Sequence, residues 1–406
     1  MKKKLMTISV AVLALAVFLM LPACRPPEPE VATLKVGCIM PFSGPASPWG
    51  DAIKPQMEVY AELINEDGGI KIGNETYQVE MFFADGEYSP EGGSRAAKEL
   101  VYDKKVSFIV GYYGDGFPAT AAVTNPEKVI FISKEHPDFD PLGKHPYTVI
   151  GTPVIEFVDT QILAFVEAYP GTTMVGDLES TLVEPMLEKE IAQAKAELEE
   201  RGIGLFSQTH PVGITDFTTY LVKFDEEGVD LIYTWAATGY VAMMAKQSAE
   251  QGYDWHLCQA GTMLDPYEFA EMAGYEAAQG TMSDWPCPWA LKKVEVSPEL
   301  LEMAGRIADR YQEKYGEPMR YMGGFGYGLQ HMSQLFAGLE KAGTLDPDQI
   351  MDTFKGGTFD TFLGEYTLSG EKTYGSLLGF GYPNCLSKLE GYEEVYASEH
   401  PILEIP

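Results

Sequence analysis

The sequence predicts an α/β protein with two doubly wound, mostly parallel sheets, one in each of two lobes. Its 406 residues are 45% hydrophobic and 22% charged, which is typical of a globular chain too long for one core. From residue 34 onward, short apolar runs alternate with segments of helical periodicity. This alternation predicts βαβ units, which build parallel sheets through right-handed crossovers. The pattern starts again after Tyr147, which indicates a second sheet.

In the first half, apolar runs predict strands, and apolar side chains at helical spacing predict the helices between them. The predicted strands are Leu34–Ile39, Tyr77–Phe83, Val106–Gly111 and Val129–Ser133. The predicted helices are Trp49–Asn65, Glu91–Tyr102 and Pro118–Asn125.

The second half repeats this alternation and adds two later helices. Its predicted strands are Thr172–Asp177, Gly204–Thr209, Asp230–Trp235 and His256–Ala260. Its predicted helices are Glu156–Ala168, Glu184–Arg201, Asp216–Glu227, Tyr240–Gln251, Glu299–Tyr315 and Gly323–Ala342. Ser297 is the expected N-cap of the helix that Pro298 opens. Gly324, Gly326 and Gly328 follow no strand, so they indicate close helix packing rather than a dinucleotide loop.

The amino terminus has the pattern of an export signal. Three lysines follow Met1, residues 5–21 are almost wholly apolar, and Leu21-Pro-Ala-Cys24 comes next. This order is typical of a secretory signal peptide, and it resembles the lipobox of bacterial lipoproteins. The resemblance implies cleavage after residue 23 and a lipid on Cys24; a plain signal peptide or an uncleaved anchor is the alternative. Residues 24–32, rich in proline, would then form a tether.

Charge and cysteine content exclude several classes of function. The chain has 60 acidic and 29 basic residues, a net charge of −31, or −31 − 3 = −34 once the three lysines of the signal peptide are removed. Such a surface repels phosphate backbones, so we expect no nucleic-acid partner. Five cysteines without a Cys-x-x-Cys pair argue against a zinc or redox site. We expect buried thiols at Cys38 and Cys258, whereas Cys287 and Cys385 could pair.

Motifs for catalysis, cofactors and metals are absent from the sequence. It contains no Gly-x-Ser-x-Gly, His-Glu-x-x-His or Walker loop, and its six histidines are scattered. The segment Asp138–Gly143 has some calcium-loop spacing, but Leu142 occupies a ligand position. We therefore expect a protein that is not an enzyme and that carries no metal and no cofactor.

Several motifs occur in an order that resembles one family of receptors. They are Lys35–Gly44, Ile64–Ile70, Phe83–Gly86, Val106–Gly111, Val129–Ser133, Asp216–Leu221, Gly228–Tyr233 and Phe359–Gly364. This series resembles the type I periplasmic binding proteins, specifically the leucine/isoleucine/valine-binding receptors of ABC transporters. Each motif is weak alone, but their order and spacing cover nearly all of the chain after residue 33.

The resemblance implies a fold of two lobes joined by a hinge of three crossovers, with a ligand cleft between them. Lobe 1 would comprise residues 33–148 plus 281–355, and lobe 2 residues 149–280 plus 356–406. The implied function is capture of a small organic solute by hinge closure for the permease subunits of an ABC importer. A sensor that signals to a membrane partner without transport is the alternative. We expect a monomer, exported and held at the membrane by the Cys24 lipid.

The resemblance also suggests where ligand would bind, because ligands of doubly wound sheets lie beyond the carboxyl ends of the strands. Relatives that bind amino acids hold the carboxylate with a hydroxyl residue after the third strand. Here that loop contains Tyr112, Tyr113, Asp115 and Gly116, and Asp115 would repel a carboxylate or else cap the next helix.

After the fourth strand, Glu135 and His136 stand where the family often has small residues and a threonine. The acid that clamps an amino group would fall near Gly261, where the sequence has no acid. These departures weaken the assignment to branched-chain amino acids.

Aromatic residues at strand ends are the remaining candidates for ligand contact. Among them, Trp49 and Trp235 follow strands whose carboxyl ends should face ligand, although core packing is the common role of any single ring. Indole rings stack on flat or cationic groups. We therefore expect ligand contacts at Trp49 and Trp235 and a flat or cationic solute, such as an amide, an amine or an aromatic compound.

Overall fold

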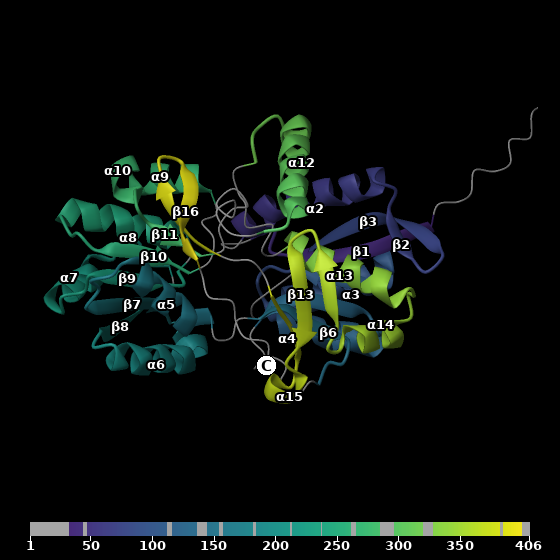
Figure 1. The fold of residues 1–406 in the computed structure, drawn as a ribbon, viewed down its shortest axis with the longest axis horizontal. Coiled ribbons are helices and arrows are strands. Elements are labelled where there is room, and N and C mark those ends of the chain that lie inside the picture. Colours follow the sequence, from purple (N-terminus) through teal and green to yellow (C-terminus); the bar gives the residue numbers. More distant parts are fainter. Residues whose placement is uncertain are drawn as a thin grey trace, which may run out of the picture. The chain divides into compact units, whose positions relative to one another are not determined.

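A computed structural model describes residues 32–43, 47–111, 116–135, 144–153, 157–181, 184–211, 213–236, 238–260, 265–284, 296–319, 328–381 and 385–399. Within these residues the chain forms two mixed, mostly parallel β-sheets with helices packed on them (Figure 1). The predicted α/β class with two doubly wound sheets is confirmed.

The first sheet contains nine strands within the described residues, in the order β12-β13-β14-β6-β5-β4-β1-β3-β2. These are β1 (Ala32–Met40), β2 (Ile70–Ile72), β3 (Glu75–Asp85), β4 (Phe108–Gly111), β5 (Ile130–Glu135), β6 (Thr148–Pro153), β12 (Thr358–Thr361), β13 (Gly364–Ser369) and β14 (Leu377–Phe380). The central pairs, from β14 with β6 to β4 with β1, are parallel. Antiparallel pairs lie toward the two edges.

Both faces of the first sheet carry an apolar layer. Its helices are α2 (Ser47–Glu66), α3 (Pro90–Lys98), η1 (Glu99–Lys104), α4 (Phe117–Thr124), η2 (Asn125–Glu127), α12 (Pro298–Tyr315), α13 (Gln330–Ala342), α14 (Pro347–Phe354) and α15 (Glu371–Tyr374). Successive strand residues point to opposite faces, so Val110 packs with α2, α12, α13 and α14 while Ile109 packs with α3, η1 and α4. This explains why the central strands read as continuous apolar runs.

The second sheet contains seven strands within the described residues, in the order β16-β15-β11-β10-β9-β7-β8. They are β7 (Met174–Ser180), β8 (Gly204–His210), β9 (Leu231–Thr234), β10 (His256–Gln259), β11 (Met282–Ser283), β15 (Cys385–Glu390) and β16 (Glu393–Glu399). β7 to β11 pair in parallel, and β15 and β16 add antiparallel strands at one edge.

Helices also cover both faces of the second sheet. They are α5 (Phe157–Ala168), α6 (Glu184–Glu200), α7 (Thr218–Glu226), α8 (Thr238–Gln251), α9 (Pro266–Ala273) and α10 (Tyr275–Ala278). Ile232 of β9 packs with the layer of α7 to α10, while its neighbours Leu231 and Tyr233 pack with α5 and α6.

Several local predictions are confirmed in detail. The Ser297 hydroxyl accepts a hydrogen bond from the Leu300 amide at 3.1 Å, so Ser297 is the N-cap of α12. A Cβ atom on Gly328 would lie 2.7 Å from Met57 of α2, which confirms close helix packing as the reason for this glycine. Cys38 and Cys258 are buried. Cys385 is buried too, but Cys287 lies outside the described residues, so their pairing stays a prediction.

Sheet membership differs from the expected division of the chain in three places. β6 was not predicted as a strand. β11 joins the second sheet, although residues 281–355 were assigned to lobe 1. β12 to β14 join the first sheet, although residues 356–406 were assigned to lobe 2. β14 pairs with β6 because its neighbouring residues Leu377 and Leu378 supply apolar side chains to opposite layers of the first sheet. The lobe boundaries themselves, as bodies that move, stay a prediction.

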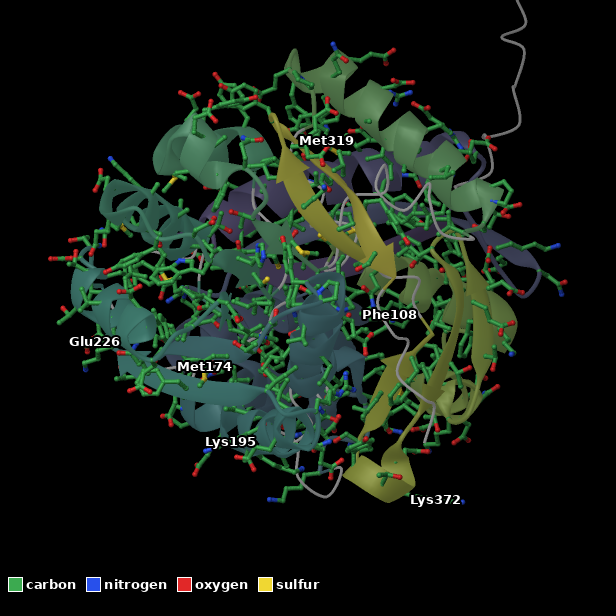
Figure 2. All side chains as sticks on the ribbon, turned by 60° about the vertical axis from the view of Figure 1, so that its left-hand side comes forward. Phe108, Met174, Lys195, Glu226, Met319 and Lys372 are labelled. Atoms are coloured by element: carbon green, nitrogen blue, oxygen red, sulfur yellow. The ribbon has the colours of Figure 1, made fainter. Side chains whose placement is uncertain are left out.

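Most charged side chains of the described residues lie on the outside of these layers, and a small group of them is buried. Figure 2 shows Lys195, Glu226 and Lys372 at the periphery, and all of them are exposed, whereas Phe108 is buried. Within the described residues, no helix combines the length and the apolar character needed to cross a bilayer.

Candidate functional site

A buried lysine lies at the carboxyl end of the fourth parallel strand of the first sheet. β5 runs through the apolar residues Ile130–Ile132 and ends at Lys134 and Glu135, which are both buried. The pairing of β5 with β6 shifts register between Ser133 and Lys134, as in a β-bulge. Bulges re-aim the side chains that follow them and are frequent beside functional sites.

Lys134 meets an indole ring from the second sheet. Trp235 directly follows β9, and the Lys134 Nζ atom lies over its ring at 5.4 Å from the centroid. An ammonium at this distance from an indole face is stabilised by the ring quadrupole, by about 2 kcal/mol where both groups are desolvated. The contact therefore joins the carboxyl edges of the two sheets.

Burial and two nearby carboxylates act in opposite directions on the pKa of Lys134. Burial lowers the pKa of the ammonium to about 8, because desolvation outweighs the attraction of the carboxylates of Asp284 and Glu135. Asp284 directly follows β11 and is fully buried. Lysine is rarely buried without a reason, so this position is a candidate site for function.

Gln161 of α5 fixes both Trp235 and Asp284. Its side-chain carbonyl accepts hydrogen bonds from the Trp235 indole N–H at 3.1 Å and from the Tyr233 hydroxyl at 2.8 Å. Its amide group donates to the Asp284 carboxylate. Both ends of the Gln161 side chain are thus used, which holds the indole in one orientation.

Two buried carboxyl groups, Asp177 and Glu179, lie on β7, the strand that pairs with β9. Glu179 Oε1 accepts a hydrogen bond from the Trp235 backbone N–H at 2.7 Å, while Glu179 Oε2 has no partner among the described residues. Burial, reinforced by the nearby charge of Asp177, raises the pKa of Glu179 well above its usual value. Burial likewise raises the pKa of Asp177 to about 7. Both groups therefore favour the protonated, uncharged form.

His331 of α13 supplies a neutral polar group close to Lys134. Its Nε2 atom lies 3.1 Å from the Thr152 hydroxyl of β6, and burial together with the charge of Lys134 lowers its pKa to about 3. His331 thus adds no charge to the site at neutral pH.

Four of the predicted ligand-contact residues lie in the described part of the chain. Trp235 and Glu135 lie at the Lys134 site, at the ends of β9 and β5. Trp49 is half-buried and packs against the apolar layer of the first sheet. Gly116 is buried beside Gly93 of α3, where a Cβ on Gly93 would lie 2.7 Å from the Gly116 carbonyl oxygen. Contact of these residues with ligand stays a prediction.

The other predicted positions lie outside the described residues. They are the lipidation site Cys24 and the ligand-contact candidates Tyr112, Tyr113, Asp115, His136 and Gly261.

Sequence reasoning missed Lys134, Gln161, Asp284 and His331 as site residues. One signal was available for Lys134, because a lysine that directly continues a buried strand cannot reach water without bending away. Gln161 and His331 lie on helices whose periodicity gives no reason to single them out. The sequence shows no acid near Gly261, but Asp284 directly follows β11, the strand that pairs with β10.

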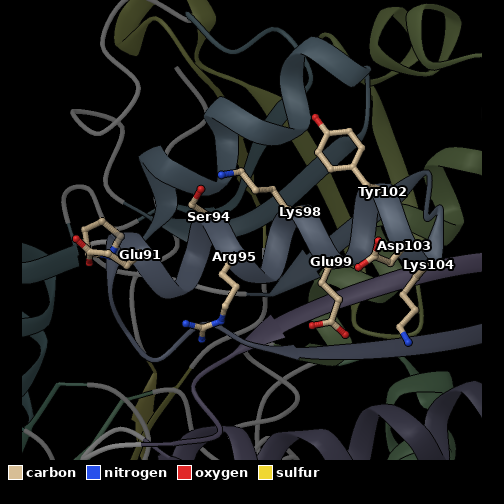
Figure 3. Close-up of a pocket in the computed structure, with 9 residues that line it drawn as sticks. Glu91, Ser94, Arg95, Lys98, Glu99, Tyr102, Asp103 and Lys104 are labelled. Carbon is tan, nitrogen blue, oxygen red and sulfur yellow. The ribbon is translucent and has the colours of Figure 1, made fainter.

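Neither a metal site nor a second binding pocket is found among the described residues. These residues contain no group of histidine, cysteine and acidic side chains suited to a metal ion. A hollow of about 900 Å³ runs along α3 and η1. Figure 3 shows Ser94, Lys98 and Tyr102 on one side of the helix and Arg95, Glu99 and Lys104 on the other, so its polar groups do not converge.

Comparison with known proteins gives one matching family and many similar folds. The profile of the periplasmic binding protein family matches residues 33–375. The Leu/Ile/Val-binding protein homolog 1 of Brucella abortus is 22% identical over 359 residues, which cover 82% of this chain and 85% of that protein.

Two solved structures illustrate the similarity of fold. One is the substrate-binding protein of the branched-chain amino acid transporter from Streptococcus pneumoniae in complex with isoleucine, with a TM-score of 0.70, 18% identity and coverage of 91% and 100% of the two chains. The other is a solute-binding protein of an ABC transporter from Rhodopseudomonas palustris in complex with p-hydroxybenzoic acid, with a TM-score of 0.69, 22% identity and coverage of 92% and 97%.

Proposed function

The chain belongs to the periplasmic binding protein family, and on that premise we propose that it captures a small organic carboxylate beside Lys134 and Trp235 and delivers it to an ABC importer. The family places the protein outside the cytoplasm, with a small-molecule ligand and ABC permease subunits as its partners. We expect the solute to be released chemically unchanged, as befits relatives that are solute-binding proteins.

The contact between Lys134 and Trp235 is the observation that supports this assignment of the site. It brings a buried cation from one sheet against an aromatic ring from the other, at the carboxyl ends where doubly wound folds bind ligands. A ligand that touches both residues would favour the closed arrangement of the two lobes, because it gains both contacts only there.

The nature of the solute follows from the structural neighbours by analogy. One neighbour holds isoleucine and the other holds p-hydroxybenzoic acid, and both ligands carry a carboxylate. A buried lysine suits such a group through charge-assisted hydrogen bonds. We therefore propose a small aliphatic or aromatic carboxylate as the ligand, with or without an amino group.

Calorimetric titration of the purified chain with leucine, isoleucine, benzoate and p-hydroxybenzoate tests the function. We expect at least one saturable 1:1 interaction, weakened at least about tenfold by Trp235→Phe, which loses the indole N–H and ring area. Trp255→Phe is the matched control, because Trp255 donates to Ser248 at 3.1 Å and directly precedes the amino end of β10. Absence of binding by every solute, or equal weakening by both variants, contradicts the proposal.

The amino-terminal signal supports attachment to the membrane. The basic start, the apolar segment 5–21 and Cys24 suit export followed by lipidation. We propose that a lipid on Cys24 and the proline-rich residues 24–32 hold a monomeric binding protein at the outer side of the cytoplasmic membrane. A single mature size for wild type and Cys24→Ala, both released into the soluble fraction, would contradict the lipid anchor.

A further inference from the structure

Three exposed tyrosine rings form a cluster where α9, α10 and the hairpin of β15 and β16 meet (Figure 1). Tyr267, Tyr275 and Tyr392 expose 40%, 45% and 42% of their surface. The ring centroid of Tyr392 lies 4.8 Å from that of Tyr267 and 5.3 Å from that of Tyr275. Five tyrosines are well exposed among the described residues, and three of them lie together here. Tyrosine is enriched at protein interfaces, so this tyrosine cluster is a candidate interaction surface.

The surroundings of the tyrosine cluster are acidic. Residues 265–279 and 390–394 together contain seven acidic residues and no lysine or arginine. The Tyr392 hydroxyl donates a hydrogen bond to Glu271 Oε1 at 3.3 Å, which places a carboxylate beside the rings. Three further glutamates of these segments are exposed, namely Glu268, Glu276 and Glu393. The surface therefore combines aromatic rings with negative charge.

The tyrosine cluster lies away from the carboxyl ends of the second sheet. β15 runs antiparallel to β11, and the Gly280 amide, just before β11, donates to the Leu389 carbonyl at 2.9 Å. The turn that carries Tyr392 therefore lies at the amino end of β11, where Gln279 Oε1 accepts from the Gly391 amide at 2.7 Å. The candidate ligand site lies at the opposite, carboxyl ends of the strands. The tyrosine cluster is thus a separate surface, and its role does not depend on the proposed function.

An arginine side chain is the group that this combination suits best. Its planar guanidinium stacks on aromatic faces and donates to carboxylates through a fixed fork of N–H groups, so it can use a ring and Glu271 together. A lysine ammonium has no planar face and is more strongly hydrated. Lys388, which precedes the turn, is paired with Glu390 at 2.6 Å. Phosphate groups, anionic lipids and a second acidic copy of this chain would each be repelled by the glutamates.

We propose that Tyr267, Tyr275, Tyr392 and Glu271 form a docking surface for an arginine-bearing segment of a partner protein. The guanidinium lies over a tyrosine ring and pairs with the Glu271 carboxylate, which the Tyr392 hydroxyl already orients. Because the rings and the carboxylate are exposed to water, the association is reversible and weakens as salt is added.

Fluorescence anisotropy with labelled peptides tests this docking surface on the purified protein. The probe is a fluorescein-labelled peptide of alternating glycine and arginine. It is compared with a lysine version, and with a citrulline version that keeps the shape of arginine without its charge. At an ionic strength of about 0.15 M, we expect the arginine peptide to bind at least about threefold more tightly than the lysine peptide. We expect at least about a tenfold advantage over the citrulline peptide.

Two variants and their matched controls locate the binding of the arginine peptide. Tyr392→Ser removes the central ring and Glu271→Gln removes the charge, and each should weaken binding by about threefold or more. Tyr102→Ser and Glu127→Gln are the controls, because Tyr102 is also exposed and its hydroxyl donates to Glu127 at 3.2 Å, outside the tyrosine cluster. Both controls should leave the affinity unchanged. Thermal melts show whether all four variants are folded.

Several outcomes would overturn the proposal. One is an arginine peptide that binds no more tightly than the citrulline peptide. Another is equal binding of the lysine peptide, which would indicate attraction by net charge alone. Equal weakening by Tyr392→Ser and Tyr102→Ser, or by Glu271→Gln and Glu127→Gln, would place the binding elsewhere. A dimer of the protein in sedimentation without peptide, lost in Tyr392→Ser, would assign the surface to a second copy instead. None of these results concerns solute binding, which the calorimetric titrations test separately.

Discussion

Gly338 in α13 is a position where one added methyl group should disturb the packing of the fold. A Cβ atom built there would lie 1.9 Å from Cε1 of Phe354, whose ring is fully buried between α14 and the first sheet. Phe354 also packs edge-on against Phe359 at 5.7 Å between ring centroids, so the ring has little room to withdraw. α13 carries His331, so a shift of this helix would reach the candidate site.

Two opposing effects set the magnitude for Gly338→Ala. Alanine in a helix interior gains about 1 kcal/mol over glycine. Overpacking of a well-packed core costs typically about 1–3 kcal/mol, and the upper end applies at a contact this short. We therefore expect the variant to be less stable than wild type by about 2 kcal/mol.

Gly305→Ala is the matched control for this prediction. Gly305 lies inside α12, and no atom lies within 4 Å of a Cβ built on it. Here only the helix-propensity gain applies, so the variant should be stabilised by about 1 kcal/mol. Urea denaturation of the three proteins at equal ionic strength measures the expected gap of about 3 kcal/mol between the variants. If Gly338→Ala proves as stable as Gly305→Ala, the packing argument for α13 and α14 is wrong.

Three further predictions concern the site and the amino terminus. Because the pKa of Asp177 is raised in the folded state, the stability it contributes is present at low pH and is lost as the pH rises through about 7. Wild type should therefore lose on the order of 2–4 kcal/mol more stability between pH 5 and pH 8 than Asp177→Asn, which cannot ionise at this position. Thermal melts that show the same pH profile for both proteins would refute this. Gln161→Met removes the acceptor of the Tyr233 hydroxyl and the Trp235 indole N–H, which should cost about 1–3 kcal/mol and shift tryptophan emission; wild-type stability and emission would contradict that role. Cys24→Ala should move the protein from the membrane fraction to the soluble fraction, and metabolic labelling with a radioactive fatty acid should mark only the unsubstituted chain.

Part of the candidate site could be predicted from the sequence. Trp235 was singled out because it ends an apolar strand, and it does lie at the end of β9 against Lys134. The lysine itself was not selected, since strand periodicity reveals burial but not which group from another sheet will meet a buried side chain. Asp284 was missed for a similar reason, because β11 is a two-residue strand too short to produce a periodic signal.

The path of the chain between the two sheets was likewise predicted only in part from the sequence. The break at Tyr147 was predicted from the restart of the strand–helix pattern, yet Thr148–Pro153 forms β6 on the first sheet before the second begins. Residues 358–380 return to that sheet and add three strands at its edge, beside β6. Local sequence cannot specify such an edge, because any strand with apolar residues on both faces can extend a sheet.

The sequence by itself determined the α/β class, the succession of strands and helices, and caps such as that of Ser297, because periodicity and capping depend on residues a few positions apart. The tertiary structure decided which strands are neighbours and brought Lys134 of β5 over the indole of Trp235, a pair 101 positions apart in the chain. That contact depends on how the two sheets come together, and its favourable energy is the attraction of the ammonium to the ring quadrupole, which opposes the cost of removing water from the cation. No local pattern encodes it.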